Sequence, residues 1–355
     1  MEELDKLRGE IDEIDSEILK LLNKRAQVVL SIGKIKQNDK VGFHSPERER
    51  EIFERLRKLN PGPFPNDALK TVYREILSAS LYLEQPLKVA YLGPAATFTH
   101  LAALRQFGSS ARYIPEVSIR GVFEAVNRAR ADYGVVPIEN SIEGVVSYTL
   151  DMLIDSELKI ASEIMLEVSH NLLSKSGKKP DIKQIYSHPQ AAAQCRIWLE
   201  ENIHGIPIID ATSTANAAEL AAREPSSAAI ASELAASVYD LMFVERGIED
   251  YRDNYTRFLV ISKNFPSRTG QDKTSIMFSI KDRPGALYDI LTPFKKAKIN
   301  LTKIESRPSK RKAWEYIFFV DMVGHIEDGV VKKAIEEMKE GCLYLKVLGS
   351  YQSGE

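Results

Sequence analysis

Apolar residues near the start of the chain recur every three or four positions, which is the period of an α-helix that packs along one seam. Arg25 occupies a place in this series where the pattern requires an aliphatic side chain. Because a guanidinium keeps its charge, Arg25 needs an anionic ligand or an acidic partner, and the pattern leaves both open. The apolar members of the series are Leu4, Leu7, Ile11, Ile14, Ile18, Leu21, Val28, Ile32 and Ile35.

The pattern predicts that the segment up to residue 84 is entirely helical. We expect helices over residues 3–37, 46–59 and 66–83, with Ser45 and Asn66 as capping residues of the second and third. The first helix is about 50 Å long at 1.5 Å per residue. Three helices of such unequal length cannot cover the whole apolar seam within one chain. We therefore expect the chain to dimerise through its first helix.

After residue 86, short β-branched runs alternate with helical stretches, which predicts an α/β fold with a parallel or mixed sheet. Residues 263–272 read as a linker. Beyond it the pattern predicts the βαββαβ order of a ferredoxin-like domain. The predicted domains are 1–85, 87–265 and 273–351. The expected α/β strands are 89–92, 133–138, 184–187, 206–209, 228–231 and 258–261, and the later elements are 275–280, 285–297, 301–307, 314–322, 329–340 and 344–348.

Composition narrows the function classes. The chain has 355 residues, a formal net charge of −2 and no basic stripe, which argues against a nucleic-acid partner. No apolar run is long enough to span a membrane, so we expect no membrane association. Cys195 and Cys342 are the only cysteines, and no His/Cys cluster has metal-ligand spacing. We therefore expect a cytoplasmic protein without a signal peptide or a metal site.

Several charged residues of the helical segment fall on shared faces. Lys36 lies eleven residues after Arg25, so three turns return it to within about 20° of the same face. Ser80 and Glu84 are four residues apart on the third helix. Arg8 lies about 25 Å from Arg25 along the first helix, so one small ligand cannot touch both. If both serve one site, Arg8 comes from a second chain; a solvated surface charge is the alternative.

These residues resemble the site of the all-helical chorismate mutase family. The resemblance implies a Claisen rearrangement of chorismate to prephenate, catalysed by restraint and electrostatic stabilisation. In it, Arg25 and a second chain's Arg8 bind the carboxylates, while Lys36 and Glu84 contact the ether oxygen. The remaining matching residues lie at the other end of the substrate. Among them, Ser45 replaces an aspartate of some relatives, and it contacts a substrate hydroxyl or only caps its helix. The matching residues are Arg8, Arg25, Lys36, Ser45, Arg48, Glu49, Ser80 and Glu84.

Glu84 leads to a sharper expectation. An ionised carboxylate cannot donate a hydrogen bond to an ether oxygen, so Glu84 should act in its protonated form. Mutase activity should then fall as pH rises.

Five loops of the α/β segment carry polar residues at strand or helix ends, where open α/β folds bind ligands. Each loop alone is equally compatible with a turn or a helix cap. The loops are 93–98, 137–141, 187–190, 213–214 and 253–258.

Together these loops resemble the prephenate dehydratase family over residues 87–262. The resemblance implies two α/β lobes around a cleft, as in periplasmic binding proteins, and loss of water and carbon dioxide from prephenate to give phenylpyruvate. Thr256 would protonate or position the leaving hydroxyl, and a relay through Glu139 or His188 would supply the proton, without a cofactor. Ala96 replaces a glycine that is usual in relatives. The expected substrate-binding residues are Thr97, Glu139, Asn140, Ser141, His188, Gln190, Ser213, Thr214, Arg257 and Phe258.

The C-terminal segment resembles an ACT domain, an amino-acid-sensing module, on the motifs at residues 285–288 and 305–308. The resemblance implies that phenylalanine binds across a dimer interface and inhibits the enzyme. Tyr288 replaces the usual valine. A purely structural dimerisation module is the alternative. The expected effector residues are Gly285, Ala286, Leu287, Asn300, Leu301, Glu305, Ser306 and Arg307.

The combined motifs favour one chain with both enzyme activities and feedback control by phenylalanine. A homodimer or homotetramer is expected, with chorismate, prephenate and phenylalanine as ligands. One alternative is a monofunctional dehydratase whose helical segment serves only for dimerisation. That alternative does not explain Arg25, Lys36 and Glu84 on this segment. A non-catalytic amino-acid-binding regulator is a further alternative, which would not require the motif at residues 256–258.

Overall fold

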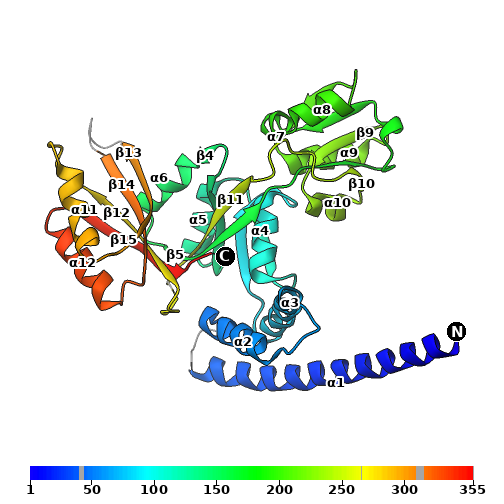
Figure 1. Cartoon of the computed structure of the whole chain (residues 1–355), viewed down its shortest axis with the longest axis horizontal. Helices are drawn as coiled ribbons and strands as arrows, with labels where there is room; N and C mark the ends of the chain where they lie inside the picture. Colours follow the sequence, from blue (N-terminus) through cyan, green and yellow to red (C-terminus); the bar gives the residue numbers. More distant parts are fainter. Residues whose placement is uncertain (40–43, 265, 309–315, 355) are drawn as a thin grey trace. The chain divides into compact units, whose positions relative to one another are not determined.

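The computed structural model describes residues 1–39, 44–264, 266–308 and 316–354. These residues form two compact units. The first contains Met1–Lys88 together with Phe107–Arg112, and the second contains the other described residues. Each unit is described by itself below, and Figure 1 labels the elements.

The first unit contains the three predicted helices, α1 (Glu2–Asp39), α2 (Pro46–Leu59) and α3 (Asn66–Glu84), and α3 packs against both others. Ser45 caps α2 as expected, because its side chain accepts a hydrogen bond from the backbone N–H of Arg48. The predicted cap of α3 is wrong. Pro65 holds the capping position without a side-chain hydrogen bond, and Asn66 is the first helical residue. The Asn66 side chain instead accepts a hydrogen bond from Asn60.

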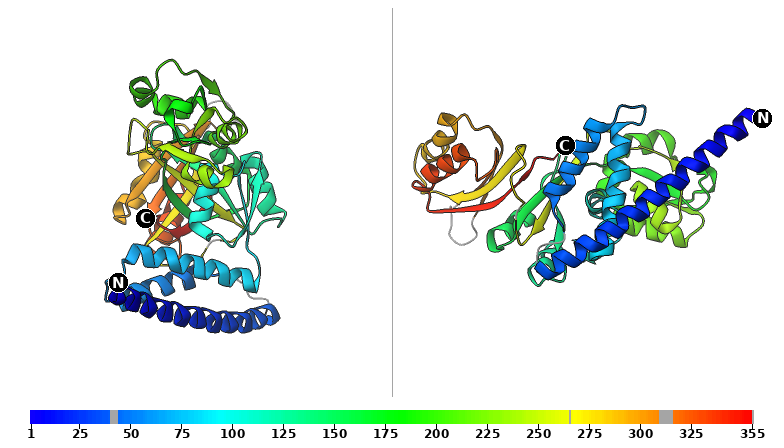
Figure 2. Two further views of the ribbon diagram at one scale, coloured as in Figure 1. Left: turned by 90° about the vertical axis from the view of Figure 1, so that its right-hand side faces the viewer. Right: turned by 90° about the horizontal axis from the view of Figure 1, so that it is seen from below.

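The apolar seam of α1 is exposed in the single chain. Its nine aliphatic members, from Leu4 to Ile35, are 42–65% exposed. The face of α1 that is buried in the single chain includes Val29 and Gly33, which lie outside that seam. Figure 2 shows the N-terminal part of α1 extending beyond α2 and α3. Burial within one chain therefore does not account for the apolar seam.

The second unit begins with an α/β lobe whose sheet has the strand order β2-β1-β3-β11-β5, with β4 beside β3. The sheet is mixed because β11 runs antiparallel to both of its neighbours. The elements are β1 (Lys88–Leu92), α4 (Phe98–Phe107), β2 (Arg112–Glu116), α5 (Ile119–Asn127), β3 (Tyr133–Asn140), β4 (Gly144–Val145), α6 (Ser147–Asp155), β5 (Lys159–Glu167) and β11 (Tyr255–Ser262).

A second α/β lobe is inserted between β5 and β11, and its sheet order is β10-β6-β9-β7-β8. Residues 168–170 lead into this lobe and residues 246–254 lead back, so two crossing segments join the lobes. All six strands predicted for the α/β segment are present, three in each lobe, whereas β2, β4, β5, β6 and β10 were not predicted. The elements are β6 (Asn171–Ser174), η1 (Lys179–Asp181), β7 (Gln184–Ser187), α7 (Pro189–Gln194), α8 (Arg196–Asn202), β8 (Ile208–Asp210), α9 (Thr214–Arg223), β9 (Ser227–Ala231), α10 (Glu233–Tyr239) and β10 (Met242–Glu245).

The last segment has the predicted βαββαβ order and the strand order β13-β14-β12-β15. The predicted beginning of its third strand, at Trp314, lies outside the described residues. The elements are β12 (Asp272–Ser279), α11 (Ala286–Lys296), β13 (Leu301–Pro308), β14 (Tyr316–Val323), α12 (Gly329–Lys339) and β15 (Tyr344–Gln352).

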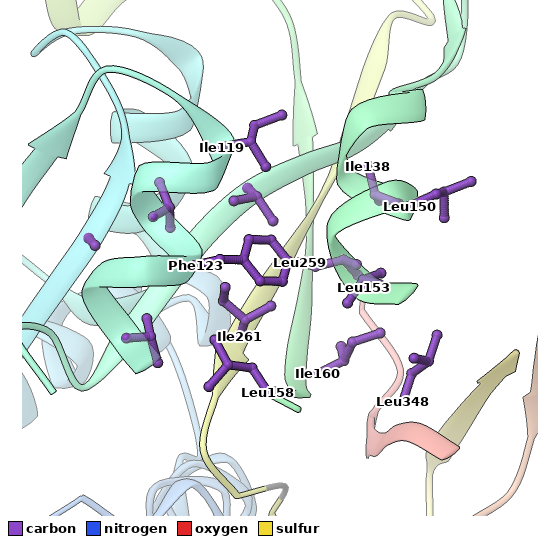
Figure 3. Close-up of a cluster of buried hydrophobic side chains, with 14 of the residues drawn as sticks. Ile119, Phe123, Ile138, Leu150, Leu153, Leu158, Ile160, Leu259, Ile261 and Leu348 are labelled. Atoms are coloured by element: carbon purple, nitrogen blue, oxygen red, sulfur yellow. The ribbon is translucent and has the colours of Figure 1, made fainter. Parts of the chain in front are cut away.

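One hydrophobic core joins this βαββαβ sheet to the first lobe. Met277, Phe319 and Leu348 pack in the same cluster as Phe123 and Leu259. Figure 3 shows Leu348 beside the side chains of the first lobe. Burial of one side chain of the size of Leu348 stabilises the fold by about 2 kcal/mol. The sheet is therefore fixed to the lobe by packing as well as by the chain connection.

Within the described residues, no helix has the length and apolar character needed to cross a membrane.

Candidate active sites

In the helical unit, α1 and α3 bring four of the predicted residues together. The guanidinium of Arg25 donates a hydrogen bond to the hydroxyl of Ser80. Lys36 Nζ donates to Glu84 Oε2 at 2.9 Å, and the Glu84 side chain is only 7% exposed. Gly33 permits this approach, because a Cβ there would lie 3.2 Å from Glu84 Cγ. Two cations and one carboxylate thus occupy one partly buried site.

The structure shows the surroundings of Arg25. Burial lowers the pKa of Arg25, and the charges of Tyr73 and Glu84 oppose this change, so the guanidinium stays cationic. None of the ion pairs between described residues includes Arg25. Its partner is instead the neutral hydroxyl of Ser80. A half-buried cation without a carboxylate partner is suited to bind an anionic ligand.

The other predicted residues of this unit have local partners. Arg8 lies near the free end of α1, where it pairs weakly with Asp5 at 3.4 Å. Arg48 pairs with Glu51 at 2.7 Å on the exposed surface of α2. Glu49 lies 3.2 Å from the ring of His44, and Ser45 acts as the helix cap. The single chain therefore does not bring Arg8 to Arg25, in agreement with their separation along α1.

In the first α/β lobe, Thr256 and Asn140 lie opposite each other on β11 and β3. Asn140 Nδ2 donates to Thr256 Oγ1 at 2.9 Å and to Asn254 Oδ1 at 2.7 Å. Thr256 Oγ1 accepts the bond from Asn140 and donates none to another described residue. Its own hydrogen is therefore available to a ligand. Ser141 fixes the neighbouring backbone, because its hydroxyl accepts from Tyr255 N at 2.9 Å.

A chain of side-chain hydrogen bonds continues from Asn254 into the second lobe. Asn254 Nδ2 donates to Gln194 Oε1 at 3.1 Å, and the ring of His170 lies 2.8 Å from the same oxygen. Burial lowers the pKa of His170, which favours the neutral ring. His170 and Asn254 lie on the two segments that cross between the lobes, so this series of hydrogen bonds connects both lobes to Thr256.

Sequence reasoning missed Asn254, Gln194 and His170. The sequence feature that could have identified Gln194 is the helix that begins at Pro189. Gln194 follows Gln190 by four residues on α7, so both amides project from one face of that helix. Asn254 belongs to the quoted 253–258 motif, but its complete burial was not visible in the sequence. No sequence pattern distinguishes His170.

The remaining loop residues serve mainly local structure. The Thr97 hydroxyl donates to the carbonyls of Leu92 and Pro94, and Ser213 caps α9 through Asn216 N. Thr214 and Gln190 belong to the first turns of α9 and α7, and His188 precedes α7. Ala96 has φ +67°, a left-handed conformation that favours glycine.

Three residues expected to bind substrate have other surroundings. Phe258 is 1% exposed, so it belongs to the interior. Arg257 and Thr256 point to opposite sides of β11, because side chains alternate along a strand. The Arg257 guanidinium pairs with Glu163 and Asp321, each at 2.7 Å. Glu139 pairs with Lys303 at 2.5 Å, so its carboxylate already has an ionic partner.

The expected effector residues divide between the two ends of β13. Gly285 has φ +78°, which favours glycine, and it precedes α11 at the end of the sheet that also holds Ser306. Ala286 and Leu287 form the first turn of α11. Asn300 and Leu301 lie at the opposite end, about 20 Å away along the strand. One chain therefore does not assemble all the predicted residues.

Side-chain alternation also divides the second effector motif. Ser306 is exposed on one face of β13, whereas Glu305 and Arg307 face the other way. Arg307 Nη2 donates to Asp151 Oδ1 on α6 at 2.7 Å. This differs from the expectation that all three side chains bind the effector, because a ligand on one face of the strand reaches only alternate residues.

Comparison with known proteins decides the family. Residues 7–85 match the type II chorismate mutase family, residues 89–266 match prephenate dehydratase, and residues 274–340 match the ACT domain. A bifunctional chorismate mutase/prephenate dehydratase of Aquifex aeolicus is 56% identical and covers 99% of this chain and 98% of its own. This chain belongs to the bifunctional chorismate mutase/prephenate dehydratase family. The corresponding Pseudomonas aeruginosa protein is 42% identical over 99% of this chain and 98% of its own.

A solved structure supports the arrangement of this family member beyond its helical unit. Prephenate dehydratase of Arthrobacter aurescens in complex with L-phenylalanine aligns with a TM-score of 0.69 and 35% identity. The alignment covers 75% of this chain and 90% of that one. The family member thus combines a helical mutase domain, a two-lobed dehydratase domain and a βαββαβ ACT domain. In its described part, no cluster of His, Cys, Asp and Glu residues has the arrangement of a metal site.

Proposed function

We propose that this protein converts chorismate to prephenate and then prephenate to phenylpyruvate, with feedback inhibition by phenylalanine. The observation that carries the proposal is the presence of two separate polar sites in one chain. Arg25, Lys36 and Glu84 form one, and Thr256 with Asn140 forms the other. A monofunctional dehydratase with a helical dimerisation domain is disfavoured, because dimerisation does not require a half-buried Arg25 without a carboxylate partner.

The helical site suits a rearrangement of a dicarboxylate. Arg25 would bind one carboxylate, and a second chain's Arg8 would bind the other. Lys36 would donate to the ether oxygen, where negative charge develops as the carbon–oxygen bond breaks. No covalent intermediate is needed, because restraint and electrostatic stabilisation lower the barrier. Arg48, Glu49, Ser80 and Ser45 would lie toward the remaining polar groups of chorismate.

The dehydratase site suits loss of a hydroxyl group. Thr256 would donate its free hydrogen to the leaving hydroxyl of prephenate, which departs as water. The ring carboxylate departs as carbon dioxide, and its electron pair completes the aromatic ring. Asn140 holds Thr256 in the donating orientation. Because Glu139 is engaged by Lys303, we favour His188 over Glu139 as the group that resupplies the proton.

The exposed seam of α1 supports a homodimer as the basic assembly, with a homotetramer as the alternative. A second α1 would cover the aliphatic row and bring its own Arg8 toward Arg25. The ACT residues at the two ends of β13 would likewise meet across chains to bind phenylalanine. We place the protein in the cytoplasm and expect neither a cofactor nor a nucleic-acid or membrane partner.

Turnover of chorismate by the purified protein tests the proposed function. Prephenate should appear first and phenylpyruvate second, both followed by chromatography. Phenylalanine should suppress phenylpyruvate formation, whereas tyrosine at the same concentration serves as the control. Binding of phenylalanine without any turnover would instead identify a non-catalytic regulator.

The pair between Lys36 and Glu84 supplies a test of the proton on Glu84. Glu84 can donate a hydrogen bond to the ether oxygen only in its protonated form. Mutase turnover should then fall as pH rises, and Glu84→Gln, which always donates, should show a flatter profile. The measurement is kcat for chorismate between pH 5 and pH 9, a range of about two units to each side of neutrality. Parallel profiles of the two proteins would mean that Lys36 alone donates.

A further inference from the structure

Two ion pairs join the ACT sheet to the strands β3 and β11. Arg257 on β11 lies with Nη1 2.7 Å from Asp321 Oδ2 on β14. Lys303 on β13 donates through Nζ to Glu139 Oε2 on β3 at 2.5 Å. The side chains of Arg257, Asp321 and Lys303 are 10%, 11% and 15% exposed. The pair of Arg257 and Asp321 is therefore largely shielded from water, which strengthens its interaction, whereas Glu139 is 36% exposed.

Arg257, Asp321, Lys303 and Glu139 form two ion pairs between the sheets, which together we call the four-charge cluster. Arg257 and Glu139 are cross-strand partners in the dehydratase sheet. Lys303 and Asp321 are cross-strand partners in the ACT sheet. Each cation therefore has an anion beside it in its own sheet and another in the facing sheet. The cluster carries no net charge, which permits its burial.

Each of the three nitrogens of the Arg257 guanidinium already has a partner. Its Nε donates to Glu163 at 2.7 Å, and its Nη2 donates to the hydroxyl of Tyr351 at 3.1 Å. Burial opposes the charge of Arg257, but Tyr351, Asp321 and Glu163 raise its pKa overall. A substrate carboxylate would have to displace two carboxylates already in place, which is unfavourable in a buried site.

The cluster lies one residue away from the proposed catalytic pair. Thr256 and Asn140 are cross-strand partners, and the next partners along β11 and β3 are Arg257 and Glu139. The strand backbones thus carry the catalytic pair and half of the cluster together. A movement of either strand changes the distance across which Asn140 orients the Thr256 hydroxyl.

We propose that Lys303 and Asp321 of the ACT domain are positioning residues for prephenate dehydration. They hold β3 and β11 in register through Glu139 and Arg257, and so fix Thr256 against Asn140. Arg257 accordingly acts as an anchor and does not bind substrate. This inference rests on the proposed dehydratase function, and its test therefore includes a measurement that does not depend on turnover.

Lys303→Met removes one cation of the cluster from the ACT side, away from the substrate. We expect kcat for prephenate to fall at least tenfold while KM changes less than twofold. Hydrogen exchange at the backbone amides of residues 255–258 should become faster without substrate. Lys333→Met, the same change at an exposed position of α12, should leave all three quantities unchanged. Lys303→Arg keeps the charge and should retain kcat within about twofold of the unaltered protein.

A rise in KM at constant kcat would show that the cluster acts on substrate binding and would overturn the proposal. Unchanged kcat and unchanged hydrogen exchange in Lys303→Met would also overturn it. If Lys303→Met does not fold, a low kcat in folded Lys303→Arg would also contradict it. If the unaltered protein does not turn over prephenate, the proposed function fails, whereas the exchange measurement still tests the anchoring of β11.

Discussion

Arg25→Ala is expected to reduce kcat/KM for chorismate by about 10²–10³-fold or more, while dehydration of supplied prephenate continues at nearly the normal rate. The magnitude is that of removing one preorganised electrostatic group from an active site. The fold should tolerate the change, because the Ser80 hydroxyl also donates to the carbonyl of Ile76 and so stays paired. Separate assays with chorismate and with prephenate measure the two activities.

Lys24→Ala is the matched control for Arg25→Ala. Lys24 precedes Arg25 on α1 and is exposed, so its removal should affect neither activity. Arg25→Lys keeps the charge but loses the planar pair of donors, and its mutase activity should be intermediate. Loss of both activities together in Arg25→Ala would mean that Arg25 supports the fold and not the mutase site.

Thr256→Val is expected to reduce kcat for prephenate by about 10²–10⁴-fold, the usual contribution of a positioned proton donor. Valine has nearly the same shape as threonine but no hydroxyl, so the leaving group of prephenate loses its donor. Asn140 Nδ2 retains Asn254 Oδ1 as an acceptor, which should preserve the local backbone. Mutase activity on chorismate should be unchanged, since the two sites are separate.

Thr256→Ser is the control for Thr256→Val. Serine keeps the hydroxyl and should retain much of the dehydratase activity, with some loss because its side chain is less restrained. Dehydratase turnover near the normal value in Thr256→Val would remove Thr256 from the mechanism. A larger loss in Thr256→Ser than in Thr256→Val would indicate that packing of the threonine methyl matters more than the hydroxyl.

The sequence predicted the elements that have a local signal, but it did not predict β2, β4, β5, β6 and β10. The three-to-four spacing predicted α1, and Ser45 with Pro46 predicted the beginning of α2. Strand and helix order predicted the βαββαβ domain. Asn66 was misread, because Pro65 sets the start of α3 without a side-chain cap. Local patterns thus determine which segments are helices or strands, and they are weaker at element ends.

Side-chain direction is the feature of the sites that the sequence conveyed least. Thr256 and Arg257 are adjacent in the motif, yet strand alternation sends them to opposite faces of β11. The same rule separates Ser306 from Arg307. A motif that is contiguous in sequence therefore contains residues with different partners, and only the packing of the ACT sheet against the dehydratase lobe showed that Arg257 contacts Asp321.

By itself, the sequence determined that this chain has a helical segment with a misplaced cation, an α/β segment with polar strand ends, and a βαββαβ segment. Tertiary structure alone decided that Arg25 has no carboxylate partner among the described residues, that Asn254, Gln194 and His170 extend the site of Thr256, and that four charges join two sheets. The physical reason is range. Helix and strand periods arise between near neighbours in the chain, whereas ion pairs join distant residues such as Glu139 and Lys303, which are 164 positions apart.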